Sequence, residues 1–206
     1  MRRILCLCFA VLVPVLPAAR PAGAEAKIAL DVGGGLIAGG YFEELRHDWR
    51  VGPGGTLFVQ LPLQNSLEAR LSGSMQWNDG TLREATGDGE PNLGQRPGDL
   101  TDTFRRTSVE AALLWRVEPR AIGQVGVPYV GAGVSTYELA AKYSTPEGDR
   151  EWTEWEPGGH FLAGVRFYRT SGLFLSMEGK LHGIDAPDDW IYAYEGAVLI
   201  GWMIGP

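Results

Sequence analysis

Charged and polar residues recur at every second position in several segments of this chain. Glu68 precedes Arg70 by two residues, and Glu178, Lys180 and His182 follow one another at the same spacing. In a β-strand, residues two apart lie on the same face, so these segments place ionisable groups side by side. Because an unpaired buried charge costs several kcal/mol, we expect these groups to pair if the faces that carry them are enclosed.

The three histidines are the residues with the clearest potential for catalysis or metal binding. His47 lies beside Asp48, whereas His160 and His182 fall on the polar faces of two successive predicted strands. Those two could form a metal pair, or His182 could activate Ser176, but such sites need convergent geometry as well as suitable residue types. We favour a hydrogen-bonded network, and we predict that the protein is not an enzyme and holds no metal.

A glycine motif near the start of the chain does not indicate a cofactor either. Gly33, Gly35 and Ala38 match G-x-G-x-x-A, a motif that binds dinucleotides only where a helix follows it. The residues after Ala38 show no helical period. The glycines are therefore expected to allow close packing in a strand, and no cofactor is predicted.

The elements that must position these residues are β-strands with one apolar face. The clearest spans residues 67–77, where Leu67, Ala69 and Leu71 alternate with Glu68 and Arg70. Only a period of two explains this pattern, because a helix would scatter the charges around its axis. Seven further segments alternate in a similar way, over about 27–39, 56–63, 106–117, 125–140, 159–168, 173–182 and 191–204.

The connections between these strands are alternately long and short. Residues 40–55, 78–105, 142–152 and 183–190 form the longer ones, whereas 64–66, 118–123 and 169–172 form short turns. Outer-membrane barrels keep short turns on the periplasmic side and long loops outside. Four loops and three turns, with both chain ends on the turn side, predict an all-β fold: an eight-stranded antiparallel up-and-down transmembrane β-barrel.

In such a barrel the polar face of each strand points inward and forms the candidate site. The interior of an eight-stranded barrel is just wide enough for side chains to fill it, so we predict a salt-bridged, largely closed lumen. The predicted lumen charge network comprises Asp31, Glu68, Arg70, Arg106, Glu110, Arg116, Glu138, Arg166, Glu178, Lys180 and Glu195.

Aromatic residues lie mostly toward the strand ends, where membrane barrels carry girdles at both interfaces. The strand over 125–140 is rich in glycine, so its inward face is less clear. If Thr136 and Glu138 face inward, the tyrosines of this strand face lipid. The predicted girdle comprises Trp77, Trp115, Tyr129, Tyr137, Tyr192, Tyr194 and Trp202.

Two segments resemble strands of small outer-membrane barrels of the OmpA, OmpX and OmpW type. They are Pro128-Tyr129-Val130-Gly131-Ala132-Gly133-Val134 and the run from Gly159 to Phe167. The resemblance implies a Gram-negative-type outer membrane, with outer-membrane lipid and lipopolysaccharide as surroundings and the barrel-assembly machinery as a partner. The chain departs from these proteins in closing on Gly205-Pro206, where they usually end on an aromatic residue.

The N-terminus has the features of a secretory signal peptide. Arg2 and Arg3 precede an apolar stretch over 4–16, and Ala22-Gly23-Ala24 fits the small-x-small cleavage pattern. An uncleaved anchor is the alternative, but Pro14 and Pro17 interrupt the stretch. We predict a signal peptide over 1–24 and one barrel domain over 25–206; Cys6 and Cys8 would be lost with the leader.

The charge balance excludes some partners. The chain has 18 Lys and Arg against 25 Asp and Glu, a formal net charge of -7. Removal of the predicted leader, which carries three arginines, would bring it to about -10. Nucleic acid is therefore not an expected partner.

These observations favour a structural or surface-interaction role carried by extracellular loops. A narrow channel or carrier for small solutes is one alternative, and a soluble periplasmic lipocalin-like binding barrel is another. The direction of the apolar face separates the last of these from a membrane barrel, because a soluble barrel turns its apolar face inward.

Overall fold

The computed structural model describes residues 29–42, 48–49, 51–64, 66–81, 102–117, 126–145, 148–168, 172–186 and 190–205. The predicted signal peptide, with both cysteines, and His47 lie outside these ranges. Within the described residues, no helix is long and apolar enough to cross a membrane.

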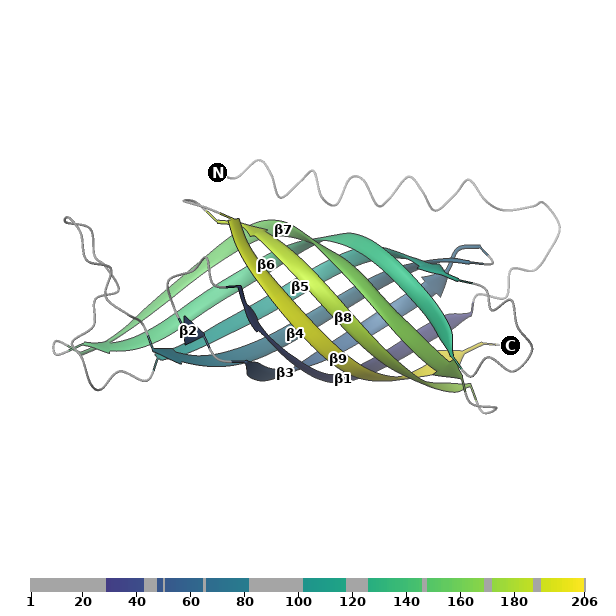
Figure 1. Cartoon of the computed structure of the whole chain (residues 1–206), viewed down its shortest axis with the longest axis horizontal. Helices are drawn as coiled ribbons and strands as arrows, with labels where there is room; N and C mark the ends of the chain where they lie inside the picture. The colour runs from purple at the N-terminus through teal and green to yellow at the C-terminus, as the bar shows by residue number, and fades with distance from the viewer. Residues whose placement is uncertain are drawn as a thin grey trace.

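Antiparallel strands close into a barrel (Figure 1). β1 pairs with both β3 and β9, and β4 with β5, so the sheet has no first or last strand. β2 and β3 pair with successive parts of the same edge of β4, so they count as one strand position. The barrel therefore has eight strand positions, which confirms the predicted fold. The strands are β1 (Leu30–Tyr41), β2 (Asp48–Trp49), β3 (Gly52–Pro62), β4 (Leu67–Thr81), β5 (Asp102–Arg116), β6 (Val127–Thr145), β7 (Gly148–Tyr168), β8 (Leu173–Asp185) and β9 (Trp190–Ile204).

The β3–β4, β5–β6 and β7–β8 connections lie at one end of the barrel, here called the turn end, together with Leu30 and Ile204. The opposite end is the loop end. In the β7–β8 connection, Gly172 has a φ of 78°, a left-handed conformation that glycine adopts without steric cost.

The barrel carries its apolar side chains outside. On β4, Leu71 is 58% exposed, whereas its neighbours Arg70 and Ser72 are buried. A soluble lipocalin-like barrel requires the opposite phase, so this alternative is not supported. The outer belt consists of Leu36, Leu57, Leu71, Val109, Leu113, Val130, Val134, Phe161, Met177, Leu181, Val198 and Ile200.

β6 has the opposite phase to the predicted one, which corrects three assignments. Tyr129 and Tyr137 are buried in the interior, 1% and 0% exposed, and do not belong to the girdle. Glu138 lies between the buried Tyr137 and Leu139 and points outward. Its carboxylate accepts a hydrogen bond from Arg105 Nη2 at 2.5 Å, so the charge is compensated outside the barrel.

β6 and β7 are longer than predicted, with 19 and 21 residues. Their pairing continues from Val127↔Arg166 to Thr145↔Gly148, so the predicted loop over 142–152 is wrong: most of it is a β-hairpin. The β6–β7 hairpin extends beyond the other strands at the loop end (Figure 1). A strand of about 9–11 residues crosses a bilayer, so both strands have length to spare.

Candidate functional site

The interior of the barrel holds ten of the predicted network charges in two groups. Each group is formed by residues from several strands, because every strand contributes one inward face. The turn-end group comprises Asp31, Glu68, Arg70, Arg116, Arg166 and Glu178, and the loop-end group comprises Arg106, Glu110, Lys180 and Glu195.

In the turn-end group the guanidinium groups bridge strands that are distant in sequence. Arg166 of β7 lies 3.4 Å from both Asp31 of β1 and Glu68 of β4. Arg70 Nη1 donates to Glu178 Oε2 at 2.5 Å, across the barrel from β4 to β8. Gln60 of β3 accepts from Arg70 Nε at 3.0 Å, and Arg116 of β5 lies 3.0 Å from Glu68, so the group and Gln60 tie six strands together.

Aromatic rings enclose the two buried guanidinium groups. Arg70 Cζ lies 5.1 Å from the centroid of the Phe58 ring, and Arg166 Cζ lies 4.7 Å from that of Phe174. The Tyr129 ring is 5.6 Å and 5.5 Å from the two arginines. Such contacts favour a desolvated cation, which explains why tyrosine and phenylalanine sit inside this barrel.

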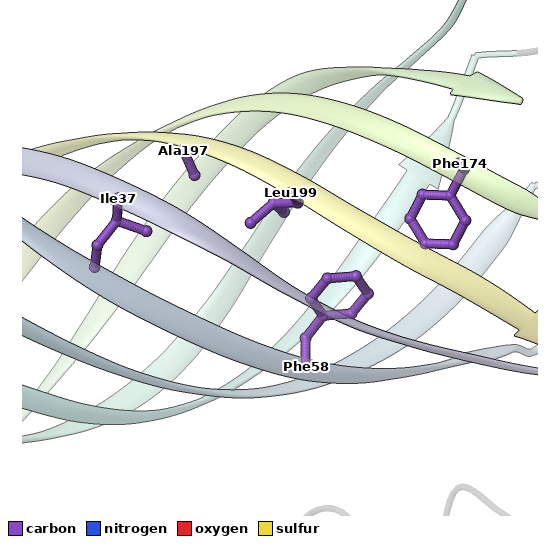
Figure 2. Close-up of a cluster of buried hydrophobic side chains, with 5 residues drawn as sticks. All are labelled: Ile37, Phe58, Phe174, Ala197 and Leu199. Carbon is purple, nitrogen blue, oxygen red and sulfur yellow. The ribbon is translucent and has the colours of Figure 1, made fainter.

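Phe58 and Phe174 belong to an apolar cluster on one wall of the interior (Figure 2). Ile37, Ala197 and Leu199 complete it, and all five side chains are buried. The two buried arginines of the turn-end group therefore lie against packed hydrocarbon.

In the loop-end group Lys180 is the central cation. Its Nζ lies 2.9 Å from Glu110 and 3.5 Å from Glu195, and a 3.8 Å approach to Glu178 connects the two groups. Arg106 Nη2 donates to Glu195 Oε2 at 2.7 Å.

The charges of these ten residues cancel. The turn-end group has three carboxylates and three guanidinium groups, and the loop-end group has two carboxylates and two cations. Glu138 does not join them, because it lies outside the barrel. Neutrality matters here because uncompensated charge in a narrow interior is costly.

His160 and His182 are neighbours on β7 and β8, with ring centroids 5.9 Å apart. Each has a hydroxyl partner: His160 Nδ1 and Ser135 Oγ lie 2.7 Å apart, and His182 Nδ1 and Tyr137 Oη lie 3.0 Å apart. In the described ranges, no three His, Cys, Asp or Glu side chains are arranged to hold a metal ion.

The Ser176–His182 couple does not form. The two residues lie six apart on β8, a separation of about 20 Å along a strand. This alternative for catalysis is therefore excluded by geometry.

An apolar cluster, here called the apolar cap, packs at the loop end of the barrel. Tyr137, Leu139 and Ala141 of β6 pack there with side chains from four other strands. Tyr41 and Phe104 make an edge-to-face contact with ring centroids 5.4 Å apart. The cap consists of Tyr41, Phe104, Tyr137, Leu139, Ala141, Ile184 and Ile191.

The remaining girdle residues lie on the outer surface toward the two ends. Trp115 and Trp202 are at the turn end, and Trp77, Tyr192 and Tyr194 are toward the loop end. Tyr192 and Trp202 are ten residues apart on β9. With a rise of about 3.3 Å and a tilt of about 40°, this spans about 25 Å, the height of the apolar band of a membrane barrel.

Sequence reasoning missed the neutral members of the site. Gln60 and Gln76 are buried and bind arginines, with Gln76 Oε1 accepting from Arg106 at 2.7 Å. Gln60 is four residues after Thr56 on β3, and Gln76 is two residues after Ser74 on β4, so each pair shares an inward face. This spacing could have identified both glutamines. The cap could not be anticipated, because its members come from five strands.

The sequence matches no known family model and no curated protein, but the structure resembles solved outer-membrane barrels. A major outer membrane protein from Thermus thermophilus matches with a TM-score of 0.55 and 13% identity, over 86% of this chain and 99% of that chain. Neisserial surface protein A matches with a TM-score of 0.53 and 13% identity, over 85% and 96%.

Ail, the attachment invasion locus protein of Yersinia pestis, was solved in complex with the heparin analogue sucrose octasulfate. It matches with a TM-score of 0.51 and 12% identity, over 86% of this chain and 98% of that chain. At these identities the likeness shows the fold. The closed sheet, the apolar outer belt and the charged interior define the chain as a small eight-stranded β-barrel of the outer-membrane type.

Proposed function

We propose that this protein is a non-enzymatic outer-membrane barrel that presents an interaction surface at its loop end. The packing of the interior is the observation that supports this role. Ten charges that cancel, packed aromatic rings and the apolar cap leave little room for solute passage, whereas the β6–β7 hairpin extends beyond the rim. Function is then carried by the surface and not by the lumen.

Outer-membrane lipid would surround the outer belt, with lipopolysaccharide against its loop-end half, and the barrel-assembly machinery would insert the chain. A heparin-like partner, as bound by Ail, is not favoured here. Glu151, Glu154 and Glu156 line the β6–β7 hairpin, and they would repel a sulfated polysaccharide.

A narrow channel is the second candidate, and conductance separates the two. Purified protein in planar lipid bilayers should show no steady ion current, because the apolar cap and the ion pairs close the path. A regular single-channel current from the unmodified protein would contradict the proposal and favour the channel.

Attachment tests the surface role directly. Bacteria that display the protein should adhere to surfaces or to one another more than bacteria that display a variant with residues 143–150 replaced by a short glycine turn. Equal attachment, with equal amounts of folded barrel in the membrane, would remove the hairpin from the proposed function.

A further inference from the structure

The β6–β7 hairpin has an open backbone edge. β7 pairs with β6 as far as Gly148, but its pairing with β8 begins only at Gly158, near the end of β8 at Asp185. Residues 149–157 of β7 therefore face no strand on that side within the described part of the chain. At about 3.3 Å per residue, this β7 edge is about 30 Å long.

Carboxylates surround the β7 edge. Glu151, Glu154 and Glu156 lie on it, and Asp185 lies where β8 ends. Asp149 and Arg150 also belong to residues 149–157, but their opposite charges cancel and leave the three glutamates as the net charge. Partial burial, together with the neighbouring Glu154 and Asp185, raises the pKa of Glu156. Lys142 is 3.8 Å from Glu151, with both side chains more than half exposed, a pair that contributes little. The potential along the β7 edge is therefore negative.

The charges determine which partner the β7 edge can accept. Exposed edges invite pairing with another chain, and proteins guard them with charge and proline; Pro157 lies at the barrel end of this one. Antiparallel pairing with a second copy would place two acidic edges side by side, and like charges across strands repel. A cationic strand reverses that interaction.

We propose that the β7 edge, residues 149–157, binds an extended lysine- or arginine-rich peptide segment by adding it as a further strand. Main-chain hydrogen bonds would supply affinity, and the carboxylates would select basic partners. This inference rests on the proposed function, since it names the class of partner for the same loop-end surface.

Backbone methylation of a peptide probe tests strand addition. The probe is a ten-residue peptide of alternating lysine and threonine, capped at both ends, added to the full protein in lipid nanodiscs. Two versions carry N-methyl groups on either the odd or the even amides. Because only one set of amides faces β7, one version should lose at least tenfold in affinity and the other should bind like the unmodified peptide. Equal behaviour of both versions would overturn strand addition.

A charge variant tests the selection of basic partners. Glu151→Gln/Glu154→Gln/Glu156→Gln should weaken binding of the unmodified peptide at least tenfold at low salt. Glu43→Gln/Glu44→Gln/Glu90→Gln removes the same net charge without changing residues 149–157, so selection by the β7 edge predicts a smaller loss of affinity from this variant than from the first. Equal weakening by both variants would overturn selection by the β7 edge.

Folding and attachment are measured on the same variants. A folded barrel that shows hairpin-dependent attachment but binds no version of the peptide would overturn the β7-edge inference and leave the proposed function in place. If attachment did not depend on the hairpin but only one of the two N-methylated peptides bound, the β7 edge would bind peptides and the proposed attachment function would be wrong.

Discussion

Lys180 is the residue on which the loop-end group depends most. Its ammonium lies within 4 Å of Glu110, Glu178 and Glu195, and its side chain is 4% exposed. The pairing is therefore not an exposed ion pair that water can replace. Removing this one cation leaves an excess of negative charge that the enclosed interior cannot hydrate.

Replacing this cation should be strongly destabilising. Lys180→Met keeps the length of the side chain but removes its charge, and we expect a loss of about 3–5 kcal/mol in the free energy of unfolding, measured by urea titration in lipid vesicles. The exposed Lys142→Met is the matched control and should cost less than about 1 kcal/mol. Similar losses for both variants would contradict a buried, charge-balanced interior.

The loss of stability in Lys180→Met should come from the uncompensated negative charge and not from the missing lysine side chain itself. The double variant Lys180→Met/Glu110→Gln removes one charge of each sign, so it should recover part of the stability that Lys180→Met loses. Additive losses from the two substitutions would mean that the two side chains do not interact.

Among the strands, β6 has an inward face that admits only small side chains at one point. A Cβ on Gly133 would lie 2.3 Å from the Ala111 carbonyl oxygen and 2.6 Å from His160 Cε1. The inward face of β6 must therefore be small where it meets the histidine. On the outward face of β8, a Cβ on Gly179 would meet no atom closer than 4.0 Å.

The two glycines should respond to alanine in opposite ways. Gly133→Ala should destabilise the barrel by about 1–3 kcal/mol, as overpacking does, whereas Gly179→Ala should stabilise it by about 0.5–1 kcal/mol through reduced chain entropy. Urea titrations of the two variants check this. A neutral Gly133→Ala would argue against the inward phase of β6.

The outer face of β4 permits a test of lipid contact. Leu71 lies on the outer belt beside Val59 and Ala111, and Leu71→Arg should cost about 2–4 kcal/mol if that position is near the bilayer midplane. Thr153→Arg, on the exposed part of the β6–β7 hairpin, is the control and should change stability by less than about 0.5 kcal/mol. Both are measured as folded yield and urea stability in vesicles.

The sequence predicted which face points inward for strands whose two faces differ in polarity, and it failed for β6, whose faces do not. β4 and β8 alternate leucine or methionine with charged residues, so a period of two identifies their phase. Through its centre β6 alternates glycine with valine and alanine. The nearest charge, Glu138, is compensated from outside by Arg105. No local pattern could reveal that cross-strand partner.

The length of the β6–β7 hairpin was missed for a different reason. Ser144, Thr145, Pro146 and Gly148 have the composition of a loop, and Glu151 and Glu154 suit solvent. Strand pairing above a membrane needs no apolar face, because water can solvate both sides. The inward residues of the ion-paired groups were easier to predict, since enclosed charges of opposite sign at two-residue spacing have few other arrangements.

For the whole molecule, the proposed roles depend on the barrel having lipid outside and charge inside. The outer belt and the ten-residue spacing of Tyr192 and Trp202 suit a bilayer. In the proposed account, the ion-paired groups and the apolar cap close the interior, and the loop end carries the interaction. If the outer belt faced water, neither the lumen nor the hairpin would have the role assigned to it.

Spin labels along β4 test this arrangement most directly. Single cysteines at residues 68–75, in a chain without Cys6 and Cys8, would be labelled in lipid vesicles, and collisions with oxygen and with a water-soluble nickel complex would be compared. We predict a period of two, with Ala69, Leu71 and Met75 accessible to oxygen and shielded from nickel, and Arg70 and Ser72 shielded from both. Nickel access at the odd-numbered positions would place the outer belt in water and contradict a membrane barrel.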